Sequence, residues 1–270
     1  MSIIVIGRRS YLGGILSKYL AEHDFTQTVS LAEFVQMPIR GTDIIINCAF
    51  SPAWYLSDLP EDLGFDGTAA AIVQGAGARY VMISSRAVYQ TRLDPPLREA
   101  EPVAPSTVYG RNKAKIESGL SKMLGERLMI LRPANVFGAE PTGRRTFVST
   151  ALGSLTRTNT IELDIAARTR KDFVPAWFVG KAAATLIERR SRGIFNIGSG
   201  TALEIGRIAN ALISGYGQGQ LHQTGERVGE EFRLDIAKLH EQTGLSLAAD
   251  AVLLEMEAVG RACKNQSGAR

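Results

Sequence analysis

A tyrosine and a lysine lie four residues apart in "VYGRNKAKIES", residues 108–118, as Tyr109 and Lys113. Residues four apart on a helix share a face, so both side chains can point into one cleft. A tyrosine pKa of about 10 makes a poor acid or base at neutral pH, and lowering it by about three units requires about 4 kcal/mol. One ammonium charge about 4 Å away supplies that energy at an effective dielectric constant of about 20. The spacing therefore predicts a tuned proton donor; a chance pair on a lysine-rich surface helix is the alternative.

Two adjacent serines, Ser84 and Ser85, could supply a hydroxyl that works together with this proton donor. The segment "ISSRAVYQ", residues 83–90, ends a predicted buried strand. Open α/β sheets assemble their sites at the carboxyl ends of the strands. A serine hydroxyl at this point would hold a carbonyl or alcohol oxygen while hydride moves to or from a neighbouring carbon.

A glycine-containing turn, "GRRSYLGG", follows the first predicted strand and opens a helix. Gly7 permits a tight turn, Gly13 allows close packing of the helix on the sheet, and the small Ser10 replaces the usual middle glycine. The backbone N–H groups and positive dipole end of a helix suit a pyrophosphate. The turn indicates a dinucleotide site, with an ordinary strand–helix turn as the alternative.

The residues around this turn favour NADP, with NAD as the other option. An NAD site usually carries an acid about 20 residues after the turn, bound to the ribose 2′-hydroxyl. The second strand ends at Ser30 without an acid at its tip, and "SLAE" indicates a capping box in which Glu33 caps a short helix. Arg8 and Arg9, in the turn itself, could bind a 2′-phosphate in a bidentate manner.

Strands and helices alternate through the first half of the chain, which predicts an α/β fold with a doubly wound parallel sheet. The predicted strands are residues 3–7, 28–30, 43–50, 79–85 and 127–133, and the predicted helices are 11–22, 63–77 and 106–122. After Gly138 the alternation loosens, with helical patterns at 147–155, 201–215 and 247–262 and a strand and turn at 193–200. We predict a dinucleotide-binding domain of residues 1–138 plus about 172–200, and a small interleaved substrate lobe of about 139–171 and 201–270.

Composition describes an ordinary soluble globular protein: 270 residues, 45% hydrophobic and 21% charged. The net charge of +4 is scattered, and no basic helix with interleaved aromatic residues indicates nucleic-acid binding. No apolar run is long enough to span a bilayer, and the chain begins directly in a strand, so we expect a cytoplasmic protein that does not bind membranes. Cys48 and Cys263 do not suggest a disulfide framework, and His23, His222 and His240 lack metal-ligand spacing, so no metal site is predicted.

Nine segments in a fixed order point to a known family. They are "GRRSYLG", "DIIINCAF", "DGTAAAIVQGAGA", "YVMISSRAVY", "VYGRNKAKIE", "LRPANVFG", "KDFVPAWFVGKAA", "GIFNIGSG" and "LDIAKL". With them the chain resembles the extended short-chain dehydrogenase/reductases, also called the NAD-dependent epimerase/dehydratase family, over nearly its whole length. The resemblance implies a Rossmann-type fold, a nicotinamide cofactor and a small-molecule substrate, commonly a nucleotide-linked sugar.

The resemblance assigns roles to residues that match the family motifs. It makes Tyr109 the catalytic tyrosine, Lys113 its partner on the nicotinamide ribose, and Ser85 the catalytic serine, with Ser84 as a structural neighbour. The implied substrate-binding residues are Ser85, Arg86, Asn135 and Lys171. Lys171 matches a position that meets the substrate diphosphate in several sugar-nucleotide enzymes, and a solvated loop lysine is the alternative. The predicted cofactor-binding residues are Gly7, Arg8, Arg9, Ser10, Tyr11, Leu12, Gly13, Ser30, Cys48, Ala49, Phe50, Tyr109, Lys113, Pro133, Asn135 and Val136.

Three features depart from the family pattern. The segment between the second strand and "DIIIN" is too short for the usual third strand and its helix, which leaves adenine recognition open. Gly64 stands where the family usually has an asparagine before "xxGT", and "PAWF" replaces a stretch that usually carries aspartates.

Several activities are compatible with these motifs. Dehydratases of the family carry an acidic pair directly after the catalytic serine or threonine, where this chain has Arg86 and Ala87, so dehydration is disfavoured. The arginines of the turn favour an NADP-dependent ketoreductase acting on a nucleotide-linked 4-keto-6-deoxyhexose. An NAD-dependent nucleotide-sugar 4-epimerase and a non-catalytic nicotinamide-sensing regulatory protein are the alternatives. Family members often dimerise through helices near 62–77 and 106–122, which makes a homodimer one option.

Overall fold

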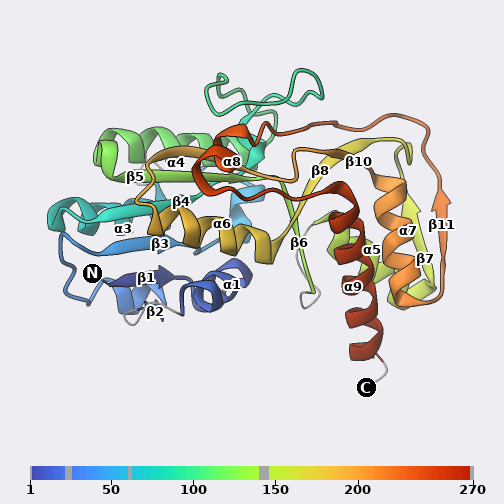
Figure 1. Ribbon diagram of the computed structural model, residues 1–270, viewed down its shortest axis with the longest axis horizontal. Coiled ribbons are helices and arrows are strands. Elements are labelled where there is room, and N and C mark those ends of the chain that lie inside the picture. The colour runs from blue at the N-terminus through green and yellow to red at the C-terminus, as the bar shows by residue number, and fades with distance from the viewer. Residues whose placement is uncertain (1, 22–25, 60–62, 140–145, 268–270) are drawn as a thin grey trace.

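The computed structural model describes residues 2–21, 26–59, 63–139 and 146–267. His23 and the predicted end of the first helix at Glu22 lie outside these residues. Figure 1 shows a sheet-and-helix half, containing the N-terminus, beside a smaller half that carries the last helix. None of the helices in the described part of the chain has the length and apolar character needed to cross a membrane.

Six parallel strands form the main sheet, in the order β2-β1-β3-β4-β5-β9. Their bounds are Ile3–Ile6 (β1), Thr26–Val29 (β2), Ile44–Asn47 (β3), Arg79–Ile83 (β4), Leu128–Pro133 (β5) and Gly193–Ile197 (β9). Strand β2 lies on one side of β1, and the chain then crosses back so that β3 lies on the other side. This reversal creates a crevice at the carboxyl ends of β1 and β3, where open α/β sheets bind their ligands.

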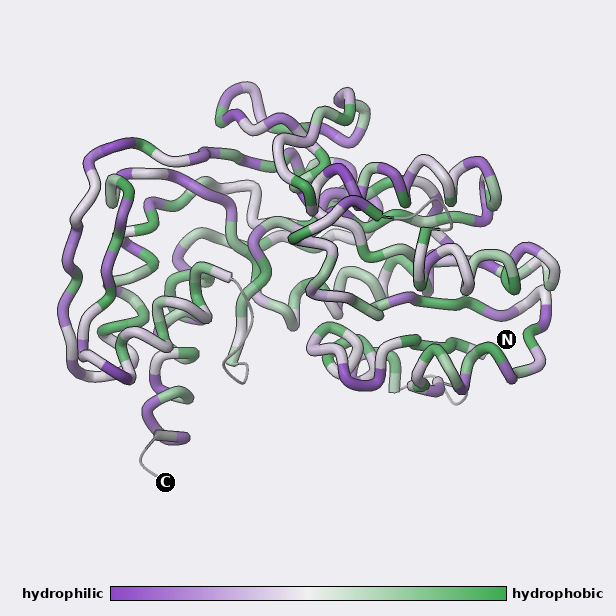
Figure 2. Tube along the Cα trace, turned by 180° about the vertical axis from the view of Figure 1, so that it is seen from behind, coloured by the Kyte–Doolittle hydropathy of each residue, from purple (hydrophilic) through white to green (hydrophobic). Residues whose placement is uncertain are grey.

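Helices cover both faces of this sheet, as Figure 1 shows and as the doubly wound prediction requires. The helices are α1 (Tyr11–Leu20), α2 (Leu31–Phe34), α3 (Gly64–Ala76), α4 (Val108–Leu124) and α6 (Ala176–Glu188). Alternate strand residues point to opposite faces. Val5 and Ile46 pack with residues of α1 and α6, whereas Ile4 and Ile45 pack with residues of α3 and α4. Figure 2 shows these strands as mostly apolar.

Within the described residues, the smaller half contains two short sheets and three helices. One sheet has the order β10-β8-β6 and the other pairs β11 with β7. The strands are β6 (Asn135–Phe137), β7 (Thr160–Leu163), β8 (Arg170–Pro175), β10 (Ala202–Glu204) and β11 (Gln220–Gln223). The helices are α5 (Phe147–Thr158), α7 (Ile205–Tyr216) and α9 (Ala249–Ser267), while α8 (Ala237–Thr243) packs with α6 and β9 of the main sheet.

Three predicted helix boundaries are wrong. The helices predicted to end at residues 155 and 262 continue to Thr158 and Ser267, and a third helix starts later than predicted. The helical pattern at 201–215 begins as strand β10, and α7 starts only at Ile205. The reason is pairing with a distant segment, since Ala202 and Glu204 lie opposite Asp172 and Arg170 of β8. The division of the chain into two domains stays a prediction.

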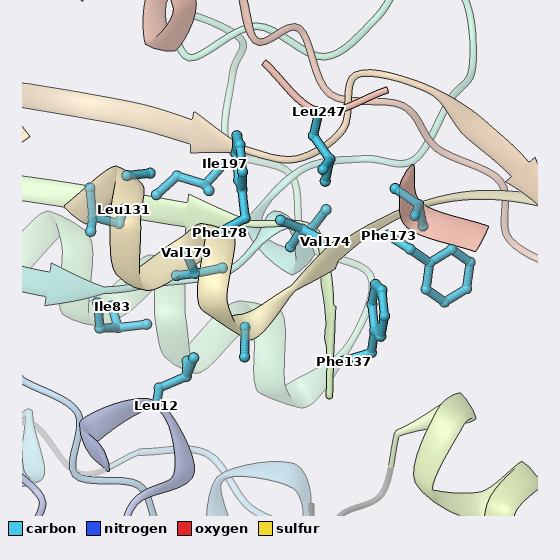
Figure 3. Close-up of a cluster of buried hydrophobic side chains, with 14 of the residues drawn as sticks. Leu12, Ile83, Leu131, Phe137, Phe173, Val174, Phe178, Val179, Ile197 and Leu247 are labelled. Atoms are coloured by element: carbon cyan, nitrogen blue, oxygen red, sulfur yellow. The ribbon is translucent and has the colours of Figure 1, made fainter. Parts of the chain in front are cut away.

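A continuous apolar core joins the two halves. Figure 3 shows Leu131 and Ile197 of the main sheet, Val179 of α6, and Phe137 and Phe173 of the β6–β8 sheet in one cluster. Because this core is shared, the strands that carry the candidate site residues are held at fixed positions relative to each other.

Candidate functional site

A cavity of about 430 Å³ opens at the carboxyl ends of the central strands. Ser85, Tyr109 and Lys113, the predicted catalytic residues, all line it. So do the predicted substrate residues Arg86, Asn135 and Lys171, and the predicted cofactor residues Ser10, Leu12, Cys48, Ala49, Phe50, Pro133 and Val136. Gly7, Arg8, Arg9, Tyr11, Gly13 and Ser30 were also predicted to bind the cofactor but are not among its lining residues.

The start of α4 brings the tyrosine to the serine. The Thr107 hydroxyl caps the helix by accepting a hydrogen bond from the Gly110 N–H, at 3.0 Å. A side chain at Gly110 would place its Cβ 2.1 Å from the backbone oxygen of Ala87, so the first turn of α4 lies directly on the segment after Ser85. Ser85 itself accepts a 3.1 Å hydrogen bond from the Ala87 N–H. A hydroxyl that accepts this bond still has its own proton to donate.

Lys113 is almost fully buried, with 5% of its surface exposed. Its Nζ donates to the Ile83 backbone oxygen at 2.8 Å and lies 4.8 Å from the ring centre of Trp54. Burial lowers the pKa of Lys113, while the charges of Asp66 and Glu117 act in the opposite direction. The two sets of contacts fix the ammonium at the carboxyl end of β4.

A buried polar network locks α4 to the sheet. Glu117 accepts hydrogen bonds from the Ser84 hydroxyl at 2.5 Å and from Arg132 at 2.5 and 3.0 Å. Arg132 also donates to the Tyr89 hydroxyl at 2.8 Å, which in turn donates to Asn196 at 2.7 Å. The network ties α4 to the ends of β4, β5 and β9. Ser84 thus takes a structural role beside Ser85.

An aromatic segment, residues 50–59, lies over the tyrosine–lysine pair. Tyr55 stacks on the Tyr109 ring with centroids 4.7 Å apart and planes at 26°. Phe50 meets both rings edge to face, at 5.5 Å from Tyr55 and 6.2 Å from Tyr109. Asn112 holds this segment with three hydrogen bonds to its backbone, at 2.7 to 3.0 Å.

A buried carboxylate stands behind Lys113. Asp66 of α3 accepts hydrogen bonds from Asn47 at 2.9 Å and from the Tyr80 hydroxyl at 2.7 Å. Burial raises the pKa of Asp66, and the charge of Lys113 opposes that shift. The cluster places a compensating acid near the buried ammonium.

Part of the cavity lining is charged. Arg86 donates to Glu230 at 3.0 Å, and its guanidinium lies 4.1 Å from the Phe232 ring centre. Lys171 lines the same cavity from strand β8, and burial, then the Arg86 charge, lowers its pKa. Two cations and one carboxylate therefore face the cavity here. Burial acts to raise the pKa of Glu230, but the charges of Arg86 and Lys171 and the hydrogen bond from Arg86 outweigh it and lower the pKa. This acid therefore stays ionised and is a poor proton donor.

The glycine turn has the close approach that its sequence predicts. Gly7 has a φ of +112°, and a Cβ on Gly13 would lie 2.5 Å from the Gly7 backbone oxygen. Ser10 caps α1 by accepting a 3.4 Å hydrogen bond from the Gly13 N–H. The turn therefore fits a dinucleotide backbone passing the start of α1.

The predicted capping box at the end of β2 is confirmed. The Ser30 hydroxyl accepts from the Glu33 N–H at 3.2 Å, and the Glu33 carboxylate accepts from the Ser30 N–H at 2.7 Å. The same carboxylate also binds Arg8 at 3.0 Å. Glu33 is thus both the helix cap and an acid at the tip of β2, a position that the sequence alone left without one.

A model of the RmlD substrate binding domain matches residues 1–201, three quarters of the chain. The chain belongs to this family. This assignment confirms the expected superfamily of short-chain dehydrogenase/reductases and the expected class of nicotinamide-dependent enzymes. A comparison with curated protein sequences finds no match.

Solved structures share the fold of this RmlD-family chain. RMD from Pseudomonas aeruginosa complexed with NADPH is 18% identical, with a TM-score of 0.79 over 98% of this chain and 100% of that one. MoeE5 in complex with UDP-glucuronic acid and NAD is 17% identical, with a TM-score of 0.81 over 99% and 100%. A UDP-N-acetylglucosamine 4-epimerase from Methanobrevibacter ruminantium M1 is 15% identical, with a TM-score of 0.79 over 98% of each chain.

Five residues of this RmlD-family site were missed from the sequence. Gly110 carries a readable signal, because a glycine inside the first turn of a helix indicates a close approach. The others are Trp54, Tyr55, Asn112 and Glu230. They reach the site through contacts between distant segments, which no local pattern reveals.

Proposed function

We propose that this protein reduces a keto group on a nucleotide-linked sugar, specifically a 4-keto-6-deoxyhexose nucleotide, with Tyr109 as the proton donor. The proposal is carried by one observation: Ser85, Tyr109 and Lys113 line one cavity at the crevice of the sheet. Membership of the RmlD family and the fold shared with nucleotide-sugar enzymes support it.

Each of the three residues has a defined task in this reaction. A reduced nicotinamide, when bound, supplies hydride to the carbonyl carbon. Ser85 donates a hydrogen bond to the carbonyl oxygen, and Tyr109 transfers its proton to that oxygen, giving the alcohol. Lys113 stabilises the phenolate that Tyr109 leaves behind. Burial of Lys113 keeps this charge from being screened by water.

The neighbouring residues support a dinucleotide and an anionic substrate. The turn with Gly7 and Ser10 would hold the pyrophosphate, and the pair Arg86 and Lys171 offers cations to the substrate diphosphate. We propose NADP as the cofactor, because Arg8 and Arg9 stand in the turn where a 2′-phosphate would lie.

One observation favours the NAD-dependent 4-epimerase as a second candidate. Arg8 already binds Glu33, and the Glu33 carboxylate at the tip of β2 can accept a hydrogen bond from a ribose 2′-hydroxyl. An acid there repels a 2′-phosphate. An epimerase retains its cofactor and causes no net change of nicotinamide redox state.

A turnover assay separates these candidates. Purified protein is mixed with a nucleotide-linked 4-keto-6-deoxyhexose and NADPH or NADH, and the nicotinamide absorbance is followed. We expect loss of NADPH, and a fall in kcat of about 10²- to 10⁴-fold in Tyr109→Phe. Tyr19→Phe, on α1 and outside the cavity lining, is the matched control and should keep wild-type turnover.

Other outcomes decide against the reductase. Interconversion of UDP-hexoses without net absorbance change would establish the epimerase. Cofactor binding that survives Tyr109→Phe, with no turnover in either protein, would indicate the nicotinamide-sensing regulator.

A further inference from the structure

We propose that Tyr55 and Trp54 are positioning residues that prepare Tyr109 for proton transfer, Tyr55 by stacking on its ring and Trp54 by covering the Lys113 ammonium. The inference rests on the proposed function, because it concerns the same proton donor. Neither residue belongs to a motif of the sequence analysis. Both come from η1 (Pro52–Tyr55), a short 3-10 helix after β3.

Tyr55 controls the orientation of the Tyr109 ring. The two rings are nearly parallel, with centroids 4.7 Å apart. Phe50 packs edge to face against both rings. Stacked and edge-to-face contacts of this kind favour one ring orientation. A ring held in this way keeps its hydroxyl directed at one place, and the stacked face is closed to water.

Trp54 controls the surroundings of the Lys113 charge. Its ring lies 4.8 Å from Nζ, and only 6% of its own surface is exposed. A cation over an aromatic face is stabilised relative to the neutral amine, which offsets part of the cost of burial. The same ring excludes water, and a lower local dielectric strengthens the effect of the ammonium on the nearby phenol.

The backbone of the segment is anchored independently of these two rings. Asn112 donates to the backbone oxygens of Trp54 and Ser57, and it accepts from the Leu59 N–H. Lys115 donates to the Leu59 backbone oxygen at 2.9 Å. Substitution of the Trp54 or Tyr55 side chain therefore leaves the anchoring bonds in place and tests the rings themselves.

Other charged groups near the pair remain constant in this comparison. Asp66 of α3, Glu117 of α4 and the Cys48 thiol after β3 act on Lys113. Among the described residues, the charged groups of the cavity wall besides Lys113 are Arg86, Lys171 and Glu230. Burial raises the pKa of Cys48 to about 12, so this thiol stays neutral at pH values well below 12.

The test is a titration of Tyr109 in the protein saturated with NADP⁺, without substrate. The chain has seven tyrosines. Each is labelled with carbon-13 at Cζ, whose resonance moves when the phenol ionises, and Tyr109→Phe assigns the signal. We expect the Tyr109 midpoint to rise by about one pH unit in both Tyr55→Leu and Trp54→Leu. Tyr55→Phe, which keeps the stacked ring, should have the same Tyr109 midpoint as the wild type.

A control in the same segment completes the design. Leu56→Ala removes an apolar side chain that is 69% exposed, and it should leave the midpoint unchanged. A merely structural role for the rings would move the melting temperature but not the Tyr109 midpoint. The inference is overturned if Tyr55→Leu and Trp54→Leu titrate like the wild type, or if Tyr55→Phe behaves like Tyr55→Leu. Since no substrate is needed, this result is independent of the turnover assay.

Discussion

Two arginine–glutamate pairs, Arg132 with Glu117 and Arg8 with Glu33, differ almost entirely in their surroundings. Arg132 and Glu117 meet at 2.5 Å with side chains that are 2% and 6% exposed. Arg8 and Glu33 meet at 3.0 Å with side chains that are 58% and 47% exposed. The chemistry is the same, but only the first pair is removed from water.

The difference in burial determines what each pair can do. A buried pair must be complete, because removing one partner leaves an uncompensated charge in a region of low dielectric. Ser84 and Tyr89 complete the Arg132–Glu117 pair with hydrogen bonds. An exposed pair contributes little to stability and can exchange partners freely. The buried pair therefore positions α4, while we propose that the exposed pair discriminates between cofactors.

The largest expected effect comes from breaking the buried pair. Glu117→Gln should lower the free energy of unfolding by about 3–5 kcal/mol, because Arg132 loses its counter-charge. Urea unfolding followed by circular dichroism measures the change. Glu126→Gln, which breaks the exposed pair of Glu126 with Arg192, is the control and should leave stability unchanged. A loss of less than about 1 kcal/mol in Glu117→Gln would contradict the assigned role.

A second buried carboxylate, Asp172, differs from Glu117 because its hydrogen-bond donors are neutral groups. Asp172 accepts hydrogen bonds from Ser199, Gly200 and Leu234, and burial raises its pKa from 3.8 to about 6. Between about pH 4 and pH 6, the Asp172 carboxyl therefore keeps its proton in the folded state but has lost it in the unfolded state. The stability from Asp172 is present below about pH 4 and is lost as the pH rises through about 6.

This sign gives a measurable pH dependence. Relative to Asp172→Asn, the wild-type unfolding free energy should fall by up to about 3 kcal/mol between about pH 4 and pH 7. Unfolding of both proteins at several pH values measures it. A difference that is constant with pH would show that the hydrogen-bond donors fully compensate the buried charge.

Breaking the exposed pair of Arg8 and Glu33 should have the smallest effect on stability. Its effect should instead be on cofactor binding. Glu33→Gln frees Arg8 and removes a charge that repels a 2′-phosphate. NADPH should therefore bind more tightly relative to NADH: the dissociation constant for NADH divided by that for NADPH should rise by about tenfold. Fluorescence titration measures both constants, and Glu126→Gln serves again as the control. An unchanged ratio would show that another contact discriminates between the cofactors. The melting temperature of Glu33→Gln should equal that of the wild type.

Local sequence patterns predicted the parts of the site that depend on local geometry. The four-residue spacing of Tyr109 and Lys113 puts both on one face of α4, and both line the cavity. The capping box at Ser30 and the tight approach of Gly13 to Gly7 follow from contacts a few residues apart. The alternation of strands and helices was enough to predict the doubly wound sheet.

The tertiary structure alone decided which distant groups surround these residues. Glu33 was predicted as a helix cap, and the fold adds its pairing with Arg8, 25 residues earlier. Glu230 reaches Arg86 across 144 residues, and Trp54 covers Lys113 although the two lie on separate elements. By itself the sequence determined the fold class and the reactive residue types, because periodicity and short spacings act over a few residues. Burial and charge pairing depend on long-range packing, so only the folded chain sets the electrostatic environment in which those residues work.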